Sequence, residues 1–119
     1  MDRTFLEDLV APFADVTVKR MFGGTGIFHR GLNFAAVMDD VLRLKADAQT
    51  IPDFEAENCG PWDYERKDGS VVTMNYYQVP ERLFDDPEEF AEWARKAFDV
   101  AMRADSEKPP SKRKLEDGL

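Results

Sequence analysis

A glycine-rich segment, Gly23-Gly24-Thr25-Gly26, is the first place where this sequence could support chemistry. Closely spaced glycines at the start of a helix expose backbone amides that can hold a phosphate group. Here Ile27 and Phe28 continue as a strand instead, and no Lys-Ser or Lys-Thr pair follows the glycines as a P-loop requires. We therefore expect the glycines to bend or bulge a strand rather than to bind a nucleotide.

The single histidine, His29, and the single cysteine, Cys59, are the other reactive side chains. A catalytic histidine needs an orienting acid and a nucleophile beside it, and His29 falls at a strand edge where the pattern offers neither. Glu55 and Glu57 precede Cys59, and acidic neighbours raise the pKa of a thiol and reduce its reactivity. Neither a zinc nor a calcium spacing occurs in the sequence. The sequence predicts no catalytic residue, no metal site and no cofactor.

Basic residues gather in one part of an otherwise acidic chain. The net charge is −8, yet residues 16–46 carry +3. Lys19 and Arg20 fall in the first expected strand, and Arg43 and Lys45 alternate with apolar residues in a later one. If these strands are neighbours, their side chains form a positive patch on the open face of a sheet. That patch is either an ordinary solvated surface or a docking site for an acidic protein segment or for phosphates.

Two adjacent tyrosines, Tyr76 and Tyr77, occupy another expected strand. Because successive strand residues point to opposite faces, we expect one tyrosine in the core and the other exposed. An exposed tyrosine beside basic residues suits an interface, and it could also stack on a single-stranded base. The predicted partner-binding residues are Lys19, Arg20, Arg43, Lys45 and Tyr77.

The placement of these side chains depends on helices and strands that the pattern of apolar residues predicts. An amphipathic helix is expected from Thr4, whose side chain would form a capping box with Glu7. Strands are expected over residues 16–22, 33–38 and 42–46. Thr50 is then expected to cap a short helix that ends before Gly60-Pro61.

A hairpin and a long helix are expected in the second half of the chain. Residues 62–66 and 71–79 would pair through a turn at Asp68-Gly69, with Pro80 ending the second strand. Asp86 is a favourable N-cap for the last helix. Short connections favour an antiparallel sheet with helices over one face, which is an α+β fold. The apolar residues of the last helix recur at helical spacing: Phe90, Trp93, Ala94, Ala97, Phe98, Ala101 and Met102.

Composition limits the class of protein. The 119 residues are enough for one domain, and an apolar share of 43% is enough for a core. No apolar run approaches the roughly 20 residues of a membrane span, and one cysteine excludes an internal disulfide. A reducing cytoplasm is therefore the expected compartment. Strong net negative charge disfavours direct DNA binding, because phosphate contacts dominate that affinity.

Several stretches together resemble the N-terminal domain of the TfoX/Sxy family of bacterial competence regulators. The resemblance runs from about residue 4 to residue 104. It is found in Lys19-Arg20-Met21-Phe22-Gly23-Gly24-x-Gly26-Ile27, in Leu42-Arg43-Leu44-Lys45-Ala46-Asp47, in Met74-Asn75-Tyr76-Tyr77-Gln78-Val79-Pro80, and in the last helix with Phe90, Trp93, Ala94 and Ala97.

The resemblance implies a two-layer α/β sandwich in the order α-β(3)-α-β(2)-α, related in shape to type III secretion chaperones. Residues 16–30 would be one strand bent at the glycines. Residues 1–104 would form the domain, and residues 105–119 a disordered polar tail where longer family members carry a helical second domain. The implied structural residues are Met21, Phe22, Gly23, Gly24, Gly26, Tyr76 and Pro80.

The resemblance also implies a non-enzymatic regulator of transcription for DNA-uptake genes that acts through a protein partner. Two other functions stay open at this point. One is a chaperone-like dimer that holds an extended peptide segment on its sheet or helix surface. The other is a weak nucleic-acid-binding module. The sequence does not name the partner, and it leaves a homodimer open.

Overall fold

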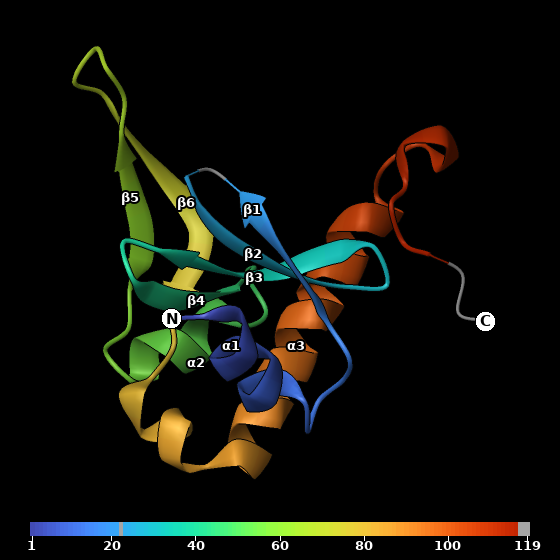
Figure 1. The fold of residues 1–119 in the computed structure, drawn as a ribbon. Helices are drawn as coiled ribbons and strands as arrows, with labels where there is room; N and C mark the ends of the chain where they lie inside the picture. Colours follow the sequence, from blue (N-terminus) through green and yellow to red (C-terminus); the bar gives the residue numbers. More distant parts are fainter. Residues whose placement is uncertain (22, 117–119) are drawn as a thin grey trace.

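The computed structural model of the chain describes residues 1–21 and 23–116. The described residues form three α-helices, two short 3-10 helices and the strands of one sheet (Figure 1). In chain order the elements are α1 (Arg3–Val10), β1 (Thr17–Met21), β2 (Gly24–His29), β3 (Leu32–Met38), β4 (Val41–Lys45), α2 (Ile51–Ala56), β5 (Pro61–Glu65), β6 (Val71–Gln78), η1 (Glu81–Asp85), α3 (Pro87–Ser106) and η2 (Pro110–Lys112).

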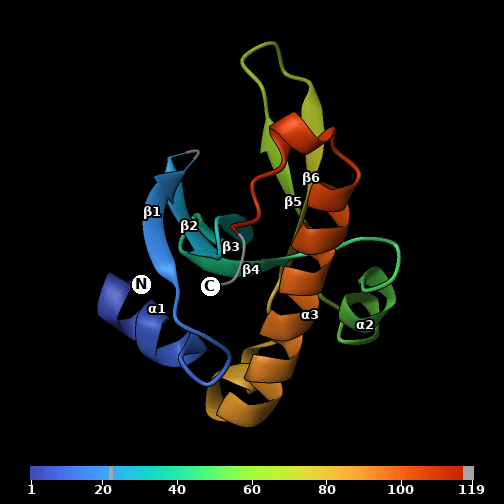
Figure 2. The ribbon, with the colours of Figure 1, turned by 90° about the vertical axis from the view of Figure 1, so that its right-hand side faces the viewer.

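The strands of the described residues form one antiparallel sheet in the order β1-β2-β3-β4-β6-β5, so β1 and β5 are its edges. The three α-helices lie on one side of this sheet, and the β1–β2 and β5–β6 hairpins extend from its two ends (Figures 1 and 2). The predicted α+β class, with an antiparallel sheet and helices over one face, is confirmed.

β1 and β2 pair as two antiparallel strands, so the expectation of a single strand bent at the glycines is wrong. β1 pairs with β2 from Thr17 opposite Phe28 to Met21 opposite Gly24. Gly23 lies in the turn with a φ of +75°, a left-handed conformation that glycine adopts without strain. Four strands rather than three therefore precede α2. Phe22, one of the implied structural residues, lies outside the described residues.

The main core lies between the sheet and the helices. Asp2, not Thr4, caps α1, because its carboxylate accepts a hydrogen bond from the backbone N–H of Phe5 (2.8 Å). Asp86 caps α3 as predicted by accepting from the N–H of Glu89 (3.2 Å). The predicted apolar stripe of α3 faces this core, and its buried members are Phe90, Ala94, Ala97, Phe98 and Ala101.

The C-terminal segment packs back onto the domain, where the sequence predicted a disordered tail. α3 continues to Ser106, and the carboxylate of Asp105 accepts hydrogen bonds from the N–H groups of Lys114 (2.7 Å) and Leu115 (3.1 Å). The N–H of Glu116 donates to the carbonyl of Arg30 in the turn after β2 (2.8 Å). These hydrogen bonds attach Lys114, Leu115 and Glu116 to the domain, and residues 117–119 lie outside the described residues.

The ion pair between Asp47 and Arg103 ties the loop after β4 to α3. The Asp47 carboxylate accepts from Nε (2.9 Å) and Nη2 (3.0 Å) of Arg103, and this hydrogen bonding holds the pKa of Asp47 below its usual range. A carboxyl whose pKa is depressed in the folded state stabilises the protein above its unfolded pKa. That stabilisation is lost as pH falls through the folded pKa.

We therefore expect Asp47→Asn to lower the free energy of unfolding at pH 7 by about 1 kcal/mol, because the pair is partly solvent-exposed. Toward pH 2 the difference from the wild type should shrink, since Asp47 becomes protonated as pH falls through its lowered pKa. Urea unfolding at the two pH values measures this. Asp8→Asn, on the exposed face of α1, is the matched control. An equal loss of unfolding free energy at both pH values would contradict the link between the ionisation of Asp47 and stability.

Candidate interaction surface

The face of the sheet opposite the helices holds a second, smaller apolar cluster. We call this side the open face. The β1–β2 and β5–β6 hairpins flank it (Figures 1 and 2). A sheet face whose centre is apolar and which no helix covers is a common form of interaction surface. The cluster consists of the buried residues Ala36, Met38 and Tyr76, with Met21, Trp62 and Met74 packed against them.

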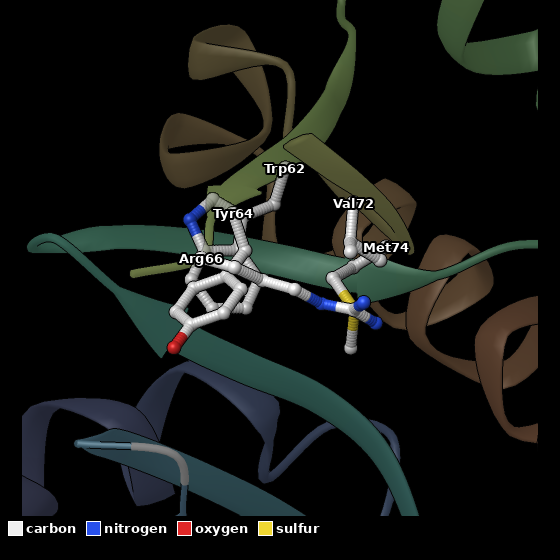
Figure 3. Close-up of a pocket in the computed structure, with 5 residues that line it drawn as sticks. All are labelled: Trp62, Tyr64, Arg66, Val72 and Met74. Carbon is white, nitrogen blue, oxygen red and sulfur yellow. The ribbon is translucent and has the colours of Figure 1, made fainter. Parts of the chain in front are cut away.

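The β5–β6 hairpin carries a groove of about 370 Å³ on the open face. Strand alternation and register place Trp62 and Tyr64 of β5 opposite Met74 and Val72 of β6. Figure 3 shows these four side chains and Arg66 on the same side of the hairpin. Tyr64 is 47% exposed, and its ring centroid lies 5.7 Å from that of Trp62. The groove therefore offers aromatic and aliphatic contacts with one guanidinium among them.

Three of the five predicted partner-binding residues lie on the open face. Lys19 is opposite Gly26, and Arg43 is opposite Ala36, which places both cations in one row across the sheet. The Lys19 ammonium lies 5.0 Å from the centre of the Phe28 ring, an arrangement that favours a cation. Lys45 is opposite Tyr76, which belongs to the cluster of the open face.

The other two predicted partner-binding residues lie on the helix side. Arg20 is opposite Thr25, whose neighbour on β3 is the core residue Val37. Tyr77 is opposite Leu44 of the main core, and its ring packs 5.4 Å from that of Phe54 in α2. The structure therefore separates Arg20 and Tyr77 from the other three residues. Of the two tyrosines, Tyr76 is the buried one, and Tyr77 is only partly exposed.

Arg43 and Lys45 are half-buried cations rather than freely solvated ones. Burial lowers the pKa of the Arg43 guanidinium, while Asp39 and Asp63 act in the opposite direction. Its Nε is buried without a hydrogen-bond partner among the described residues. Burial and Lys108 lower the pKa of Lys45, with Asp105 opposing them. Reversing either charge would place a carboxylate in these surroundings, so such variants would disturb the fold as well as the surface.

The implied structural residues pack around the turn of the first hairpin and the centre of the open face. Gly24 and Gly26 lie in β2, where added side chains would meet Val37, Met38, Met21 and Phe28. The Tyr76 hydroxyl donates to Oδ1 of Asn33 on β3, and burial raises the pKa of Tyr76. Pro80 is buried and precedes η1.

The residues that could carry chemistry are placed for packing. Nδ1 of His29 donates to the carbonyl of Asp15 (2.9 Å), and the imidazole packs edge-on against Phe13 and Phe98. Burial and Glu57 raise the pKa of Cys59, which disfavours a reactive thiolate. Gly23 lies in the turn between β1 and β2, and Gly24 begins β2, so they do not open a helix as a phosphate site would require. Within residues 1–21 and 23–116, no three acidic, histidine or cysteine side chains are grouped to hold a metal ion.

Trp62, Tyr64, Arg66 and Met74 were missing from the predicted partner-binding residues. The signal was present in the alternation of the predicted hairpin, which places Trp62, Tyr64 and Arg66 on one face. That they face the same side as Lys19 and Arg43 follows only from the pairing of β6 with β4, because β5 and β1 are at opposite edges of the sheet.

The fold and this surface define a class of protein: an α+β domain with an uncovered, mixed apolar and basic sheet face. A sequence model of the TfoX N-terminal domain matches residues 8–101, and the chain belongs to this family. A search of curated proteins finds no match. No helix within the described ranges, 1–21 and 23–116, is long and apolar enough to cross a membrane.

Proposed function

We propose that this TfoX N-terminal domain is a non-enzymatic regulatory module that binds a protein partner through its open face and thereby modulates transcription of DNA-uptake genes. The observation that carries the proposal is the group of partly exposed methionine and aromatic side chains on that face, Met74, Trp62 and Tyr64, which no helix of the described residues covers. Membership of the TfoX N-terminal family supports the regulatory role.

The side chains of the open face are those that contribute most to protein interfaces. Methionine is flexible and polarisable, so it adapts to the shape of a partner. Tryptophan, tyrosine and arginine dominate the binding energy of many interfaces, and Trp62, Tyr64 and Arg66 line one groove. The catalytic alternative lacks a nucleophile beside a base in the described residues, since His29 is hydrogen-bonded to a backbone carbonyl and packed between phenylalanines.

A nucleic-acid partner fits this surface less well than a protein partner. The chain carries a net charge of −8, and Asp39 and Asp63 act on Arg43 electrostatically. Phosphate binding needs several cations that are free of acidic neighbours. The Trp62 and Tyr64 rings are already packed against each other, which leaves no space between them for a base to stack.

The test is capture of a partner from the cytoplasm of the native host by the tagged chain, with and without nuclease. Lys19→Glu is the informative variant, because Lys19 is exposed beside Phe28 on the open face. We expect about tenfold weaker affinity for the captured protein, since a reversed charge at an interface introduces repulsion. Arg95→Glu makes the same charge change on exposed α3 and should leave capture unchanged.

Two results would overturn the proposal. Equal capture by the wild type and Lys19→Glu would place binding elsewhere on the molecule. Loss of all captured protein on nuclease treatment would mean that nucleic acid, not the domain surface, links the proteins. A stable dimer that takes up unrelated extended apolar peptides would instead favour a chaperone-like function.

A further inference from the structure

We infer that the outer edge of β5 receives an extended segment of the partner in which apolar and basic residues alternate. The inference rests on the proposed function, because it specifies how a protein partner would engage the open face. The segment would add a strand beside β5 and direct every second side chain into the groove of the β5–β6 hairpin. Its remaining side chains would lie on the opposite side, beside the acidic residues of β5.

The two edges of the sheet differ in how open they are. At the β1 edge, Nη2 of Arg3 in α1 donates to the carbonyl of Val18 (3.1 Å), so one backbone acceptor is already occupied. Within the described part of the chain, no side chain hydrogen-bonds to the backbone of β5. An unpaired strand edge presents N–H and C=O groups that a further strand can satisfy. β5 is therefore the edge with its backbone groups available.

Alternation along β5 gives its two faces opposite character. Trp62 and Tyr64 face the groove. Asp63 and Glu65 face the other way, and the Asp63 carboxylate accepts from the hydroxyl of Thr73, its register partner on β6 (2.9 Å). A strand added next to β5 continues this alternation. Its apolar residues would meet the aromatic rings, and its intervening residues would meet two carboxylates.

The carboxylates select the charge of the segment. Opposite charges on neighbouring strands stabilise a pair, and like charges destabilise it. Asp63 and Glu65 are both exposed, so lysine or arginine at the intervening positions is favoured. The same two acids disfavour a second copy of this chain paired edge to edge, and they repel the phosphates of a nucleic acid. A basic and apolar segment of another protein is the occupant that fits both faces.

The probe is a short synthetic peptide, blocked at both ends, in which leucine alternates with lysine. A matched peptide carries glutamate in place of lysine. Binding to the full chain is followed by NMR, through the indole N–H of Trp62 and through hydrogen-exchange protection of the β5 amides. We expect the lysine peptide to bind about fivefold more tightly than the glutamate peptide, because two cross-strand charge pairs change sign. Protection of β5 amides on binding would show strand addition.

A charge-swapped variant makes the test independent of simple attraction to an acidic protein. In Asp63→Lys/Glu65→Lys the preference should reverse in favour of the glutamate peptide. Glu7→Lys/Asp8→Lys makes the same change in net charge on the exposed face of α1 and should leave the preference for lysine in place. All four sites are exposed, and circular dichroism would verify that both double variants are folded before binding is measured.

The outcomes separate this inference from the proposed function. No preference between peptides, or a preference that the control double variant removes equally, would overturn the β5 site. Larger shifts at Trp62 with an oligothymidine than with either peptide would overturn it in favour of nucleic acid. If Lys19→Glu still weakens binding of the cellular partner in those cases, the open face remains the binding surface and only the β5 assignment fails.

Discussion

Phe34→Ala is expected to lower the free energy of unfolding by about 4 kcal/mol, the largest effect of any single change considered for this domain. Phe34 in β3 has no solvent exposure. Its ring packs edge-on against Phe13, 5.5 Å away in the segment after α1, and against Phe98 of α3 at 6.2 Å. Truncation would leave a cavity where three separate parts of the chain meet. Urea unfolding followed by circular dichroism measures the loss.

Phe5→Ala is the matched control for that loss. It removes the same atoms from α1, but Phe5 is 45% exposed and its main aromatic contact, Phe84, lies 6.5 Å away. We expect Phe5→Ala to lower the free energy of unfolding by less than about 1 kcal/mol, because the Phe5 side chain buries little apolar surface in the folded protein. Similar losses for Phe5→Ala and Phe34→Ala would mean that the core does not depend on the contact between β3 and α3 as the structure has it.

Phe34 also shows why the strand β3 was easy to predict, whereas the side of the sheet to which each of its residues points was not. Residues 34–38 are buried without alternation, because the second cluster covers Ala36 and Met38 on the open face. The register shifts between Ile27 and Phe28, which places Phe34 at a bulge. A continuous apolar run predicts a buried strand, but the bulge depends on the pairing with β2, which the sequence alone does not contain.

Capping residues, helical spacing and turn residues correctly predicted α3 and the second hairpin, because these elements depend mainly on residues close together in the chain. The N-cap at Asp86 and the helical spacing from Phe90 onward fix α3. The Asp68-Gly69 pair fixes the second hairpin, with Gly69 at a φ of +89°. The turn is longer than the two residues expected, since the N–H of Arg66 donates to the carbonyl of Ser70 (2.8 Å). The residue types that form this turn can be recognised in the sequence, but the length of the loop cannot.

The candidate surface was only partly predictable, because it depends on which strands become neighbours. Arg43 and Lys45 were predicted on one face of their strand, and they do share a face. Lys19 and Arg20 are adjacent in β1, so they point to opposite faces and could not both belong to that surface. Residues 105–119 were predicted to be too polar to pack, but the Asp105 carboxylate accepts two hydrogen bonds from the returning backbone. The N–H of Glu116 then donates to the carbonyl of Arg30, a contact between residues far apart in the chain that local sequence does not predict.

The glycine-rich segment was correctly singled out, but its conformation was misjudged, and alanine substitutions distinguish the two descriptions. In a single bent strand, Gly23 and Gly24 would tolerate alanine about equally. In the hairpin they differ. An alanine Cβ at Gly24 would clash with the carbonyl oxygen of Val37 in β3 and would lie 2.8 Å from Sδ of Met38. At Gly23 it would meet nothing within 4 Å, although the φ of +75° disfavours any side chain.

We therefore expect Gly24→Ala to lower the free energy of unfolding by about 3 kcal/mol, because a backbone oxygen cannot move aside without separating β2 from β3. Gly23→Ala should cost about 1 to 2 kcal/mol, the strain of a left-handed alanine. Gly60→Ala, which has open space and no positive φ, should be close to neutral. Urea unfolding of the three variants gives the order. Equal losses of unfolding free energy at Gly23 and Gly24 would contradict the hairpin. A larger loss at Gly24 would mean that this glycine is required for β2 and β3 to approach each other closely enough to form the open face.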